Sequence, residues 1–219
     1  YGDHRDLHLS IRRQRQMCIR DRSKALKRDM EVALCQNTAK NAGNATTARQ
    51  TRSFEAWITT NKSRGTGGAD GSASAAATDA ATGNRRALTE ALLKGVLQSM
   101  FTNGAEPKMA IAGPVNKGVI SGFTGRSNTR QNVSADTVSA SISVYASDFG
   151  ELQIVPSNRS RDRSLLLVDP EYAKVAYLRN FQTMDIAKIG DADTKMILAE
   201  YGLEMSNEAA HGIVADLTA

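Results

Sequence analysis

The feature that most constrains the fold is the stretch Ser141–Leu178, in which Ile142, Val144 and Ala146, and then Leu152, Ile154 and Pro156, fall on alternate positions. This period-two pattern is typical of β-strands that bury one face. Asp148-Phe149-Gly150 predicts a reverse turn between two strands, and a second strand pair, Leu165–Val168 and Ala173–Leu178, brackets the turn Asp169-Pro170-Glu171. We therefore expect a rigid sheet unit of about four strands. It contains no obvious catalytic motif.

Outside this unit, apolar residues at helical spacing predict several helices. The clearest follows Thr89, a residue type that favours the helix cap position. We expect Trp57 to anchor the core and Cys35 to be a buried structural thiol. The other predicted elements are a helix over Ser23–Asn37, a short helix with Phe54 and Ile58 that is capped by Thr46 or Thr47, a strand Met109–Ala112, a helix Asn116–Phe123, a polar loop Gly125–Ser139, a strand Ile197–Met205 and a pairing segment Ile213–Leu217.

A Gly-, Ala- and Ser-rich stretch between Asn61 and Asn84 predicts a flexible loop with little apolar area to order it. Its segment RGTGGADGS, from Arg64, invites comparison with a phosphate-binding loop. The third glycine is absent at the required spacing, no strand is predicted before the segment, and no Gly-Lys-Ser/Thr follows it. We therefore do not expect phosphate binding here.

The first part of the chain does not resemble a natural protein segment. Arg12–Arg22, RRQRQMCIRDR, back-translates in register to the transposase adapter of short-read sequencing. Tyr1–His8 back-translates to the flow-cell primer upstream of it, and Leu9–Ile11 take the place of an index barcode. We interpret residues 1–22 as a translated sequencing adapter and exclude them from fold reasoning. The alternative is a basic arm that binds nucleic acid.

Excluding the adapter weakens the argument for a basic protein. The whole chain has 28 Lys and Arg against 23 Asp and Glu, a net charge of +5. Residues 1–22 hold six Arg and three Asp, so the remainder has 22 basic and 20 acidic residues and a net charge of +2. A nucleic-acid-binding module, which needs a basic face, loses its main support.

An enzyme of unknown class, an α+β hydrolase or transferase, is the other alternative. Its candidate carboxylates are Asp148, Asp169 and Glu171, but each stands where turn chemistry already explains it. Beyond the adapter, His211 and Cys35 are the only residues of their types, which makes His-dependent nucleophilic or zinc chemistry hard to build. We expect no catalytic residue, no metal site and no cofactor.

Segments spread in order over residues 24–218 resemble one family, the major capsid proteins of tailed bacteriophages. They are KRDMEVAL from Lys27, GNATTAR from Gly43, EAWITTN from Glu55, GPVNKGVISGFTG from Gly113, VYASDFGELQIVP from Val144, RDR from Arg161, DPEYAKVAYLRNF from Asp169 and EYGLEMSNEAAHGIVADL from Glu200. The resemblance implies an α+β fold of the Hong Kong 97 capsid type. Such subunits have a peripheral domain with a spine helix and sheet, an axial domain, an extended hairpin loop and an N-terminal arm.

The resemblance also implies a division of this chain into parts. Residues 1–22 are the adapter, 23–62 the end of the spine helix and a second helix of the peripheral domain, 63–84 a flexible loop, 85–178 the axial domain and adjoining strands, and 179–219 a return strand to the peripheral domain. The arm, the extended loop and the start of the spine helix are expected upstream of Ser23, so the chain is interpreted as a metagenomic fragment.

The function that the resemblance implies is structural: self-assembly into the icosahedral head that encloses phage DNA. The expected partners are further copies of the chain and scaffold, portal and decoration proteins. Packaged DNA lies nearby without sequence-specific binding, and no membrane is involved. The expected location is the virion, after assembly in the host bacterial cytoplasm. The candidate inter-subunit contact is the charged link of Arg159, Arg161, Asp162 and Arg163.

Two expectations about assembly follow. The complete protein without the adapter should form capsomers or shells. The 219-residue chain should assemble poorly and aggregate, because its spine helix is cut and the apolar residues Leu26, Met30 and Leu34 lose packing partners.

Overall fold

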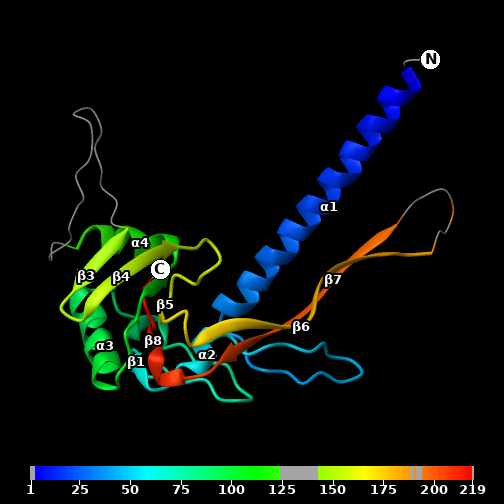
Figure 1. Cartoon of the computed structure of the whole chain (residues 1–219). Coiled ribbons are helices and arrows are strands. Elements are labelled where there is room, and N and C mark those ends of the chain that lie inside the picture. The colour runs from blue at the N-terminus through cyan, green and yellow to red at the C-terminus, as the bar shows by residue number, and fades with distance from the viewer. Residues whose placement is uncertain (1–2, 124–142, 188–189, 191–193, 219) are drawn as a thin grey trace, which may run out of the picture. The chain divides into compact units, whose positions relative to one another are not determined.

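The computed structural model describes residues 3–123, 143–187, 190 and 194–218, with side chains described from residue 17 onward (Figure 1). The chain divides into two compact units. Tyr1–Val32 and Tyr177–Tyr201 form the first, which we call the hairpin unit. Ala33–Ala176 and Gly202–Ala219 form the second, which we call the sheet unit. The predicted loop Gly125–Ser139 lies outside the described residues.

Six of the described strands form one mixed sheet in the sheet unit. In spatial order they are β1 (Asn61–Ser63), β8 (Gly212–Val214), β5 (Leu165–Val168), β2 (Met109–Ala112), β4 (Gly150–Pro156) and β3 (Val144–Ser147). The pairs β1·β8 and β2·β4 are parallel, and β5·β8, β2·β5 and β3·β4 are antiparallel. All four residues of β5 are buried, as expected for a central strand without an alternating pattern.

Three α-helices and two short 3₁₀ turns accompany the described part of this sheet. They are α2 (Phe54–Trp57), α3 (Glu90–Thr102), α4 (Pro114–Ser121), η1 (Thr82–Asn84) and η2 (Glu208–Ala210). The Thr89 side chain accepts a hydrogen bond from the Leu92 amide at the start of α3. Helix α3 packs on β1 and β8. A Cβ at Gly212 of β8 would lie 2.8 Å from Val96 Cγ1, so this close approach requires glycine.

The core of the sheet unit lies between α3 and the strands. It combines the buried face of α3 with inward residues of the sheet: Leu88, Leu93, Val96, Leu97, Met100, Ala105, Ala110, Ala112, Ile120, Tyr145, Leu152, Ile154, Leu165, Leu167, Ala210, Val214 and Leu217. Burial of such side chains contributes roughly 1.5–3 kcal/mol for each large residue. The core is therefore built from segments of α3, β2–β5 and the C-terminal end.

The hairpin unit contains most of helix α1 (Asp3–Cys35) and most of strands β6 (Ala173–Asp185) and β7 (Lys195–Met205), which form a two-stranded sheet among the described residues. Lys27 Nζ of α1 lies 5.5 Å from the centre of the Phe181 ring, so the Phe181 side of β6 contacts α1. None of the described helices combines the length and apolarity that a membrane span needs.

Several predicted elements are confirmed. The turn at Asp148-Phe149-Gly150 connects β3 and β4 as an antiparallel hairpin. The Thr89 cap, the strand Met109–Ala112 and the strand around Ile197–Met205 are all present. Helix α4 begins at Pro114, two residues before its predicted start. Cys35 is buried, as expected for a structural thiol.

Other predictions are wrong, and most of them concern strand pairing. Among the described strands, β5 pairs with β2 and β8, while β6 extends to Asp185 and pairs with β7. The predicted pair across Asp169-Pro170-Glu171 therefore does not form. The C-terminal strand β8 inserts between β1 and β5. Alternation identifies a strand and its buried face, but it does not identify the strand's partner.

Three local predictions also differ from the structure. Ser53, and not Thr46 or Thr47, occupies the cap position of α2. Trp57 is only partly buried, and the Arg52 guanidinium lies 4.4 Å from its ring centre. Met30 and Leu34 are buried within the chain, so the expected loss of their packing partners is wrong.

Candidate functional site

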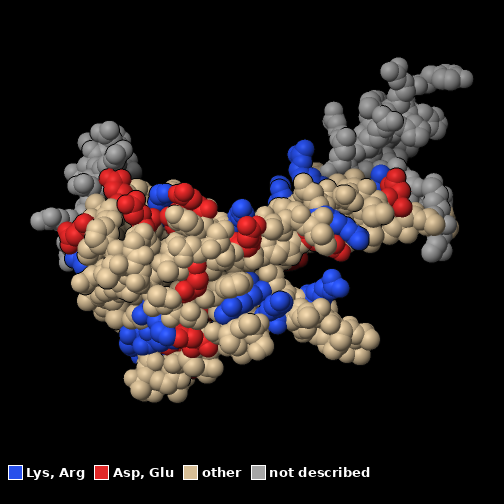
Figure 2. All heavy atoms as spheres, turned by 60° about the horizontal axis from the view of Figure 1, so that its bottom comes forward, with Lys and Arg blue, Asp and Glu red and all other residues tan. Residues whose placement is uncertain are grey.

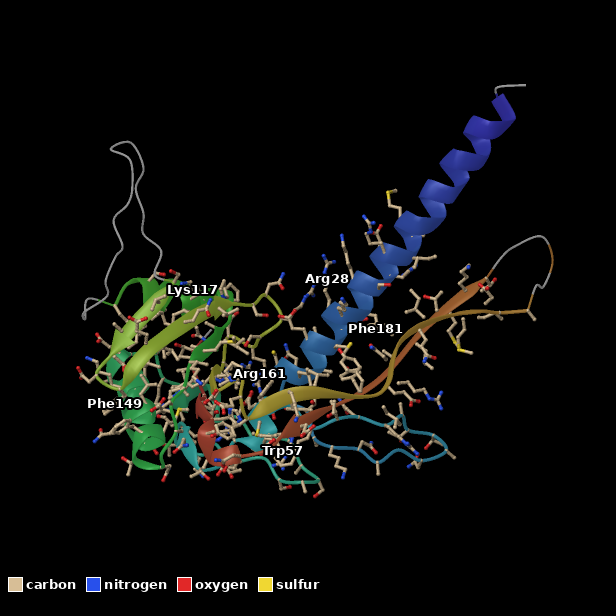
Figure 3. All side chains as sticks on the ribbon, viewed as in Figure 1. Arg28, Trp57, Lys117, Phe149, Arg161 and Phe181 are labelled. Atoms are coloured by element: carbon tan, nitrogen blue, oxygen red, sulfur yellow. The ribbon has the colours of Figure 1, made fainter. Side chains whose placement is uncertain are left out.

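The chain has a cluster of charged side chains inside the sheet unit. It joins α2, the segment after β1, the loop before η1 and the link between β4 and β5. We call it the Glu55 cluster, and its members are Glu55, Arg64, Asp70, Asp79, Arg161, Arg163 and Ser164. Figure 3 labels Arg161 in this region. The cluster brings together segments that lie far apart in the sequence.

Glu55 is at the centre of the cluster, and its side chain is 1% exposed. Arg161 Nη1 donates to Glu55 Oε2 at 3.0 Å, and the Ser164 hydroxyl donates to the same oxygen at 3.1 Å. Arg161 also pairs with Asp79, and Arg163 Nη1 lies 3.1 Å from Asp79 Oδ2. A buried carboxylate held by two donors from one link fixes that link to α2.

The second half of the cluster starts at Arg64. Its Nε donates to Asp70 Oδ1 at 2.9 Å, and its Nη1 lies 4.0 Å from Glu55 Oε1. Lys62 also pairs with Asp70. Glu55 therefore sits between two arginines that approach it from different segments.

Burial raises the pKa of Glu55 above its ordinary value, although the charges of Arg161 and Arg64 oppose the rise. A carboxyl group with a raised pKa is a candidate general acid when it lines an accessible site. Here the carboxyl is almost fully enclosed, and one of its oxygens is occupied by protein donors. This arrangement favours a structural role over catalysis.

The four predicted contact residues all lie in the link between β4 and β5. Arg161 belongs to the Glu55 cluster, and Asp162 Oδ1 accepts from the Val115 amide at 3.1 Å near the start of α4. The Arg159 carbonyl accepts from Gln36 Nε2 at 2.7 Å. Arg163 keeps 42% of its side chain exposed. Several of these groups therefore have partners within the chain, and their contact with a neighbouring subunit stays a prediction.

Asp216 anchors the Gly-, Ala- and Ser-rich loop between Asn61 and Asn84. Its carboxylate accepts from the Gly65 amide at 2.9 Å and from the Ala80 amide at 2.7 Å. Asp216 is buried and adopts a left-handed backbone conformation with φ 59°. Polar contacts with the C-terminal segment therefore help to hold this loop against the core.

The same contacts bear on the phosphate-loop comparison. A strand, β1, does precede the RGTGGADGS segment, so the prediction that no strand precedes it is wrong. Yet the Gly65 amide already donates to Asp216, and the Gly68 amide donates to the Gly65 carbonyl at 3.1 Å. These amides are occupied by acceptors within the chain and are not free to bind a phosphate.

Glu208 forms a second carboxylate anchor. It accepts from the Thr60 amide at 2.8 Å and from the Thr60 hydroxyl at 2.6 Å, and also from the Thr59 amide. Burial raises the pKa of Glu208, but the hydrogen bonds from Thr60 and Thr59 outweigh burial and lower it overall. Glu208 therefore ties the end of the α2 segment to η2.

The carboxylates considered for an enzyme occupy two separate turns. Asp169 Oδ1 accepts from the Glu171 amide at 3.0 Å, as an aspartate that stabilises a turn does. Lys108 Nζ lies 3.8 Å from Asp169 and 3.5 Å from Glu171. Asp148 lies exposed in the turn between β3 and β4. Within the described ranges, no group of three or more His, Cys, Asp or Glu could hold a metal ion.

Figure 2 presents one face of the molecule with its charged side chains coloured. Acidic and basic groups of both signs are scattered over this face and separated by uncharged surface. A nucleic-acid-binding module would instead gather basic side chains on one surface. The face shown therefore gives no support to that alternative.

Sequence reasoning missed Glu55, Asp79, Glu208 and Asp216 as structural anchors. Each bonds to a partner that is distant in the sequence: Ser164 is 109 positions from Glu55, and Gly65 is 151 positions from Asp216. No local pattern marks such residues. An acidic residue in an otherwise apolar C-terminal run, as at Asp216, was the one available signal.

Comparison with known proteins identified a family. The sequence model of the SU10 major capsid protein family matches residues 12–218. No curated protein matches the chain significantly. Among solved structures, the chain is similar to a virus-like particle from Pyrococcus furiosus, with 13% identity and a TM-score of 0.38. That match covers 59% of this chain and 53% of the other, so the chain spans about half the length of that protein.

Proposed function

Because the chain belongs to the SU10 major capsid protein family, we propose that it is a structural subunit of a phage head shell. The family match, over residues 12–218, is the observation that carries this proposal. A major capsid protein is structural and not enzymatic. The enclosed carboxylate of Glu55 is consistent with that class, since an enclosed charge pair braces a subunit but is not open to a substrate.

The surface of the hairpin unit supports association between copies. Leu178 is 81% exposed, and Met184, Ile186 and Met196 are also exposed. The Ile186 amide donates to the Thr194 carbonyl, which aligns the strands so that Met184 lies opposite Met196. Because side chains alternate along a strand, Leu178, Met184 and Ile186 lie on the face opposite Phe181, which contacts Lys27. We call this the outer face of the hairpin.

An isolated two-stranded hairpin is only marginally stable in water, and exposed apolar patches commonly mark interfaces. In a shell, many copies of one chain meet at repeated contacts. A second copy is therefore the partner that we propose for the outer face. The charged link, with Arg163 as its exposed member, is a further proposed contact.

We propose the Hong Kong 97 type for the fold. A long two-stranded hairpin and a separate sheet unit support it, together with the helical residues 23–35 and the ordered family segments. In this assignment residues 23–35 of α1 are the end of the spine helix, residues 85–178 supply the axial domain and adjoining strands, and β7 is the return strand. The proposed location is the virion after assembly in the bacterial cytoplasm, with scaffold, portal and decoration proteins as further partners.

We also propose that residues 1–22 are translated adapter. The in-register back-translation supports this, and the nucleotide sequence of the source DNA tests it directly. Nucleotides that differ from the adapter under these codons would overturn it. Helix α1 includes Asp3–Arg22 of this segment, because Arg and Gln are good helix formers whatever their origin.

Sedimentation velocity on the complete protein, expressed from the source gene without the adapter residues 1–22, tests the proposed contact. We expect Leu178→Lys to weaken concentration-dependent association, since it places a charge on the outer face. Val115→Lys is the matched control, because Val115 is an exposed apolar residue on α4, 43% exposed. Equal association of wild type, Leu178→Lys and Val115→Lys would show that the outer face does not form the contact. A wild type that stays monomeric would overturn the capsid proposal itself.

A further inference from the structure

His211 is a fully buried polar side chain that the structural role described above does not use. It lies between η2 and β8 and is 0% exposed. The Phe54 ring of α2 meets its imidazole edge-on, with ring centres 6.4 Å apart. The Asn61 side chain donates to the His211 carbonyl at 3.1 Å. The backbone and the ring are therefore both held in place.

One hydrogen bond defines the protonation state of this ring. The Asp169 amide donates to His211 Nδ1 at 3.2 Å. A ring nitrogen accepts a hydrogen bond only when it carries no proton, so the imidazole is neutral with its proton on Nε2. A protonated ring carries a hydrogen on both nitrogens and cannot accept this bond.

The bond holds a turn at the base of the β6–β7 hairpin. The Tyr172 amide donates to the Asp169 carbonyl at 3.2 Å, and the Ser206 amide donates to the Tyr172 carbonyl at 2.9 Å. The bond from Asp169 to His211 thus connects the turn that begins β6 with the segment that begins β8. All of these residues belong to the sheet unit.

The charged groups around His211 come from three segments. Asp169, in the turn after β5, and Glu208, in η2, both favour a protonated ring, as does the Tyr172 carbonyl. Lys108 lies against Asp169, and the charge of Glu208 acts on Arg52. Among the described atoms, Nε2 makes no hydrogen bond of good distance and angle. Burial is the largest influence and lowers the pKa of His211 despite these neighbours.

We propose that His211 is a pH-sensitive latch: its neutral ring holds the Asp169–Tyr172 turn against the core, and protonation releases the turn. Protonation removes the acceptor for the Asp169 amide and places a positive charge in a site without solvent. The turn at the base of the hairpin then loses its hydrogen bond to the segment that begins β8. This device does not depend on shell assembly.

The direction of the pH effect follows from the lowered pKa. Above the ordinary histidine pKa of 6.5 the ring is neutral in both the folded and the unfolded chain, so stability does not depend on this group. As pH falls below 6.5 the unfolded chain binds a proton that the folded chain resists. The folded-to-unfolded ratio then drops by up to about tenfold for each pH unit, until the pKa of the folded state is reached.

The variant His211→Asn tests the latch, because its Oδ1 can replace Nδ1 as the acceptor and does not titrate. We expect a wild-type loss of stability between about pH 7 and pH 5 and a smaller loss in the variant. The matched control is His4→Gln with His8→Gln, which removes the other two histidines of the chain and should leave the wild-type profile unchanged. Chemical denaturation at each pH measures the stability.

A second measurement does not need a variant. In wild type, hydrogen exchange at the Asp169, Glu171 and Tyr172 amides, corrected for intrinsic rate, should accelerate on acidification more than exchange in α3. A titration of His211 by NMR should follow the same pH dependence. The proposal is overturned if His211→Asn shows the full wild-type acid loss, or if these amides stay protected while His211 takes up its proton.

Discussion

Arg161 donates a 3.0 Å hydrogen bond to the buried carboxylate of Glu55, although 106 positions separate them in the sequence. The bond joins the link between β4 and β5 to helix α2. Arg161 also pairs with Asp79, so one guanidinium connects three segments of the sheet unit. A shell subunit must resist distortion by neighbouring subunits. The bonds from Arg161 to Glu55 and Asp79, which we call the clamp, oppose such distortion.

Arg161→Ala should destabilise the chain by about 3 kcal/mol, because it leaves the Glu55 carboxylate buried without its closest cation. The pKa of Glu55, already raised by burial, should rise further. Urea denaturation at neutral pH measures the loss. Arg163→Ala is the matched control: its side chain is 42% exposed, and we expect a loss below about 1 kcal/mol. Similar small losses in both variants would show that the clamp is not a major source of stability.

Gly71→Ala should lower the free energy of unfolding by about 2 kcal/mol, since the added Cβ overpacks the segment. A Cβ at this position would lie 2.7 Å from the Cα and carbonyl oxygen of Ala56, which are backbone atoms that cannot move aside easily. Gly83→Ala is the control, because nothing lies within 4 Å of its Cβ. Thermal melting compares the two, and a melting point for Gly71→Ala no lower than that of the control would contradict the packing of this loop.

Asp216→Ala should destabilise the chain by about 3 kcal/mol and expose the Gly65 and Ala80 amides to exchange. Two buried donors lose a charged acceptor in this variant. Asp216→Asn should cost less, because asparagine keeps one acceptor oxygen and tolerates the left-handed conformation at φ 59°. Hydrogen exchange at the two amides distinguishes the variants, and unchanged protection in Asp216→Ala would refute the anchor.

The sequence predicted local structure well, because local patterns carry it. The β3–β4 hairpin follows from alternation around Asp148-Phe149-Gly150, and the start of α3 follows from Thr89. Strand order was not predictable, because β8 inserts between strands that come from distant parts of the chain. The pairing of β6 with β7 replaced the expected pairing with β5, since both arrangements satisfy the same alternation.

The residues of the candidate site were less predictable than the strands. The charged link Arg159–Arg163 was identified for its charge, but Arg161 and Asp162 have partners within the chain. Those partners, such as Glu55 and the Val115 amide, carry no local signal. The structural class was predictable for another reason, because it rested on the ordered family segments, and the family match supports it.

Electron microscopy combined with light scattering tests the central claim most directly. The sample is the complete protein expressed from the source gene, without the adapter residues 1–22, examined over a range of concentrations. We expect capsomers or closed shells of uniform size, and their amount should increase with concentration. A well-folded protein that remains monomeric at the highest concentration would show that it is not a shell subunit.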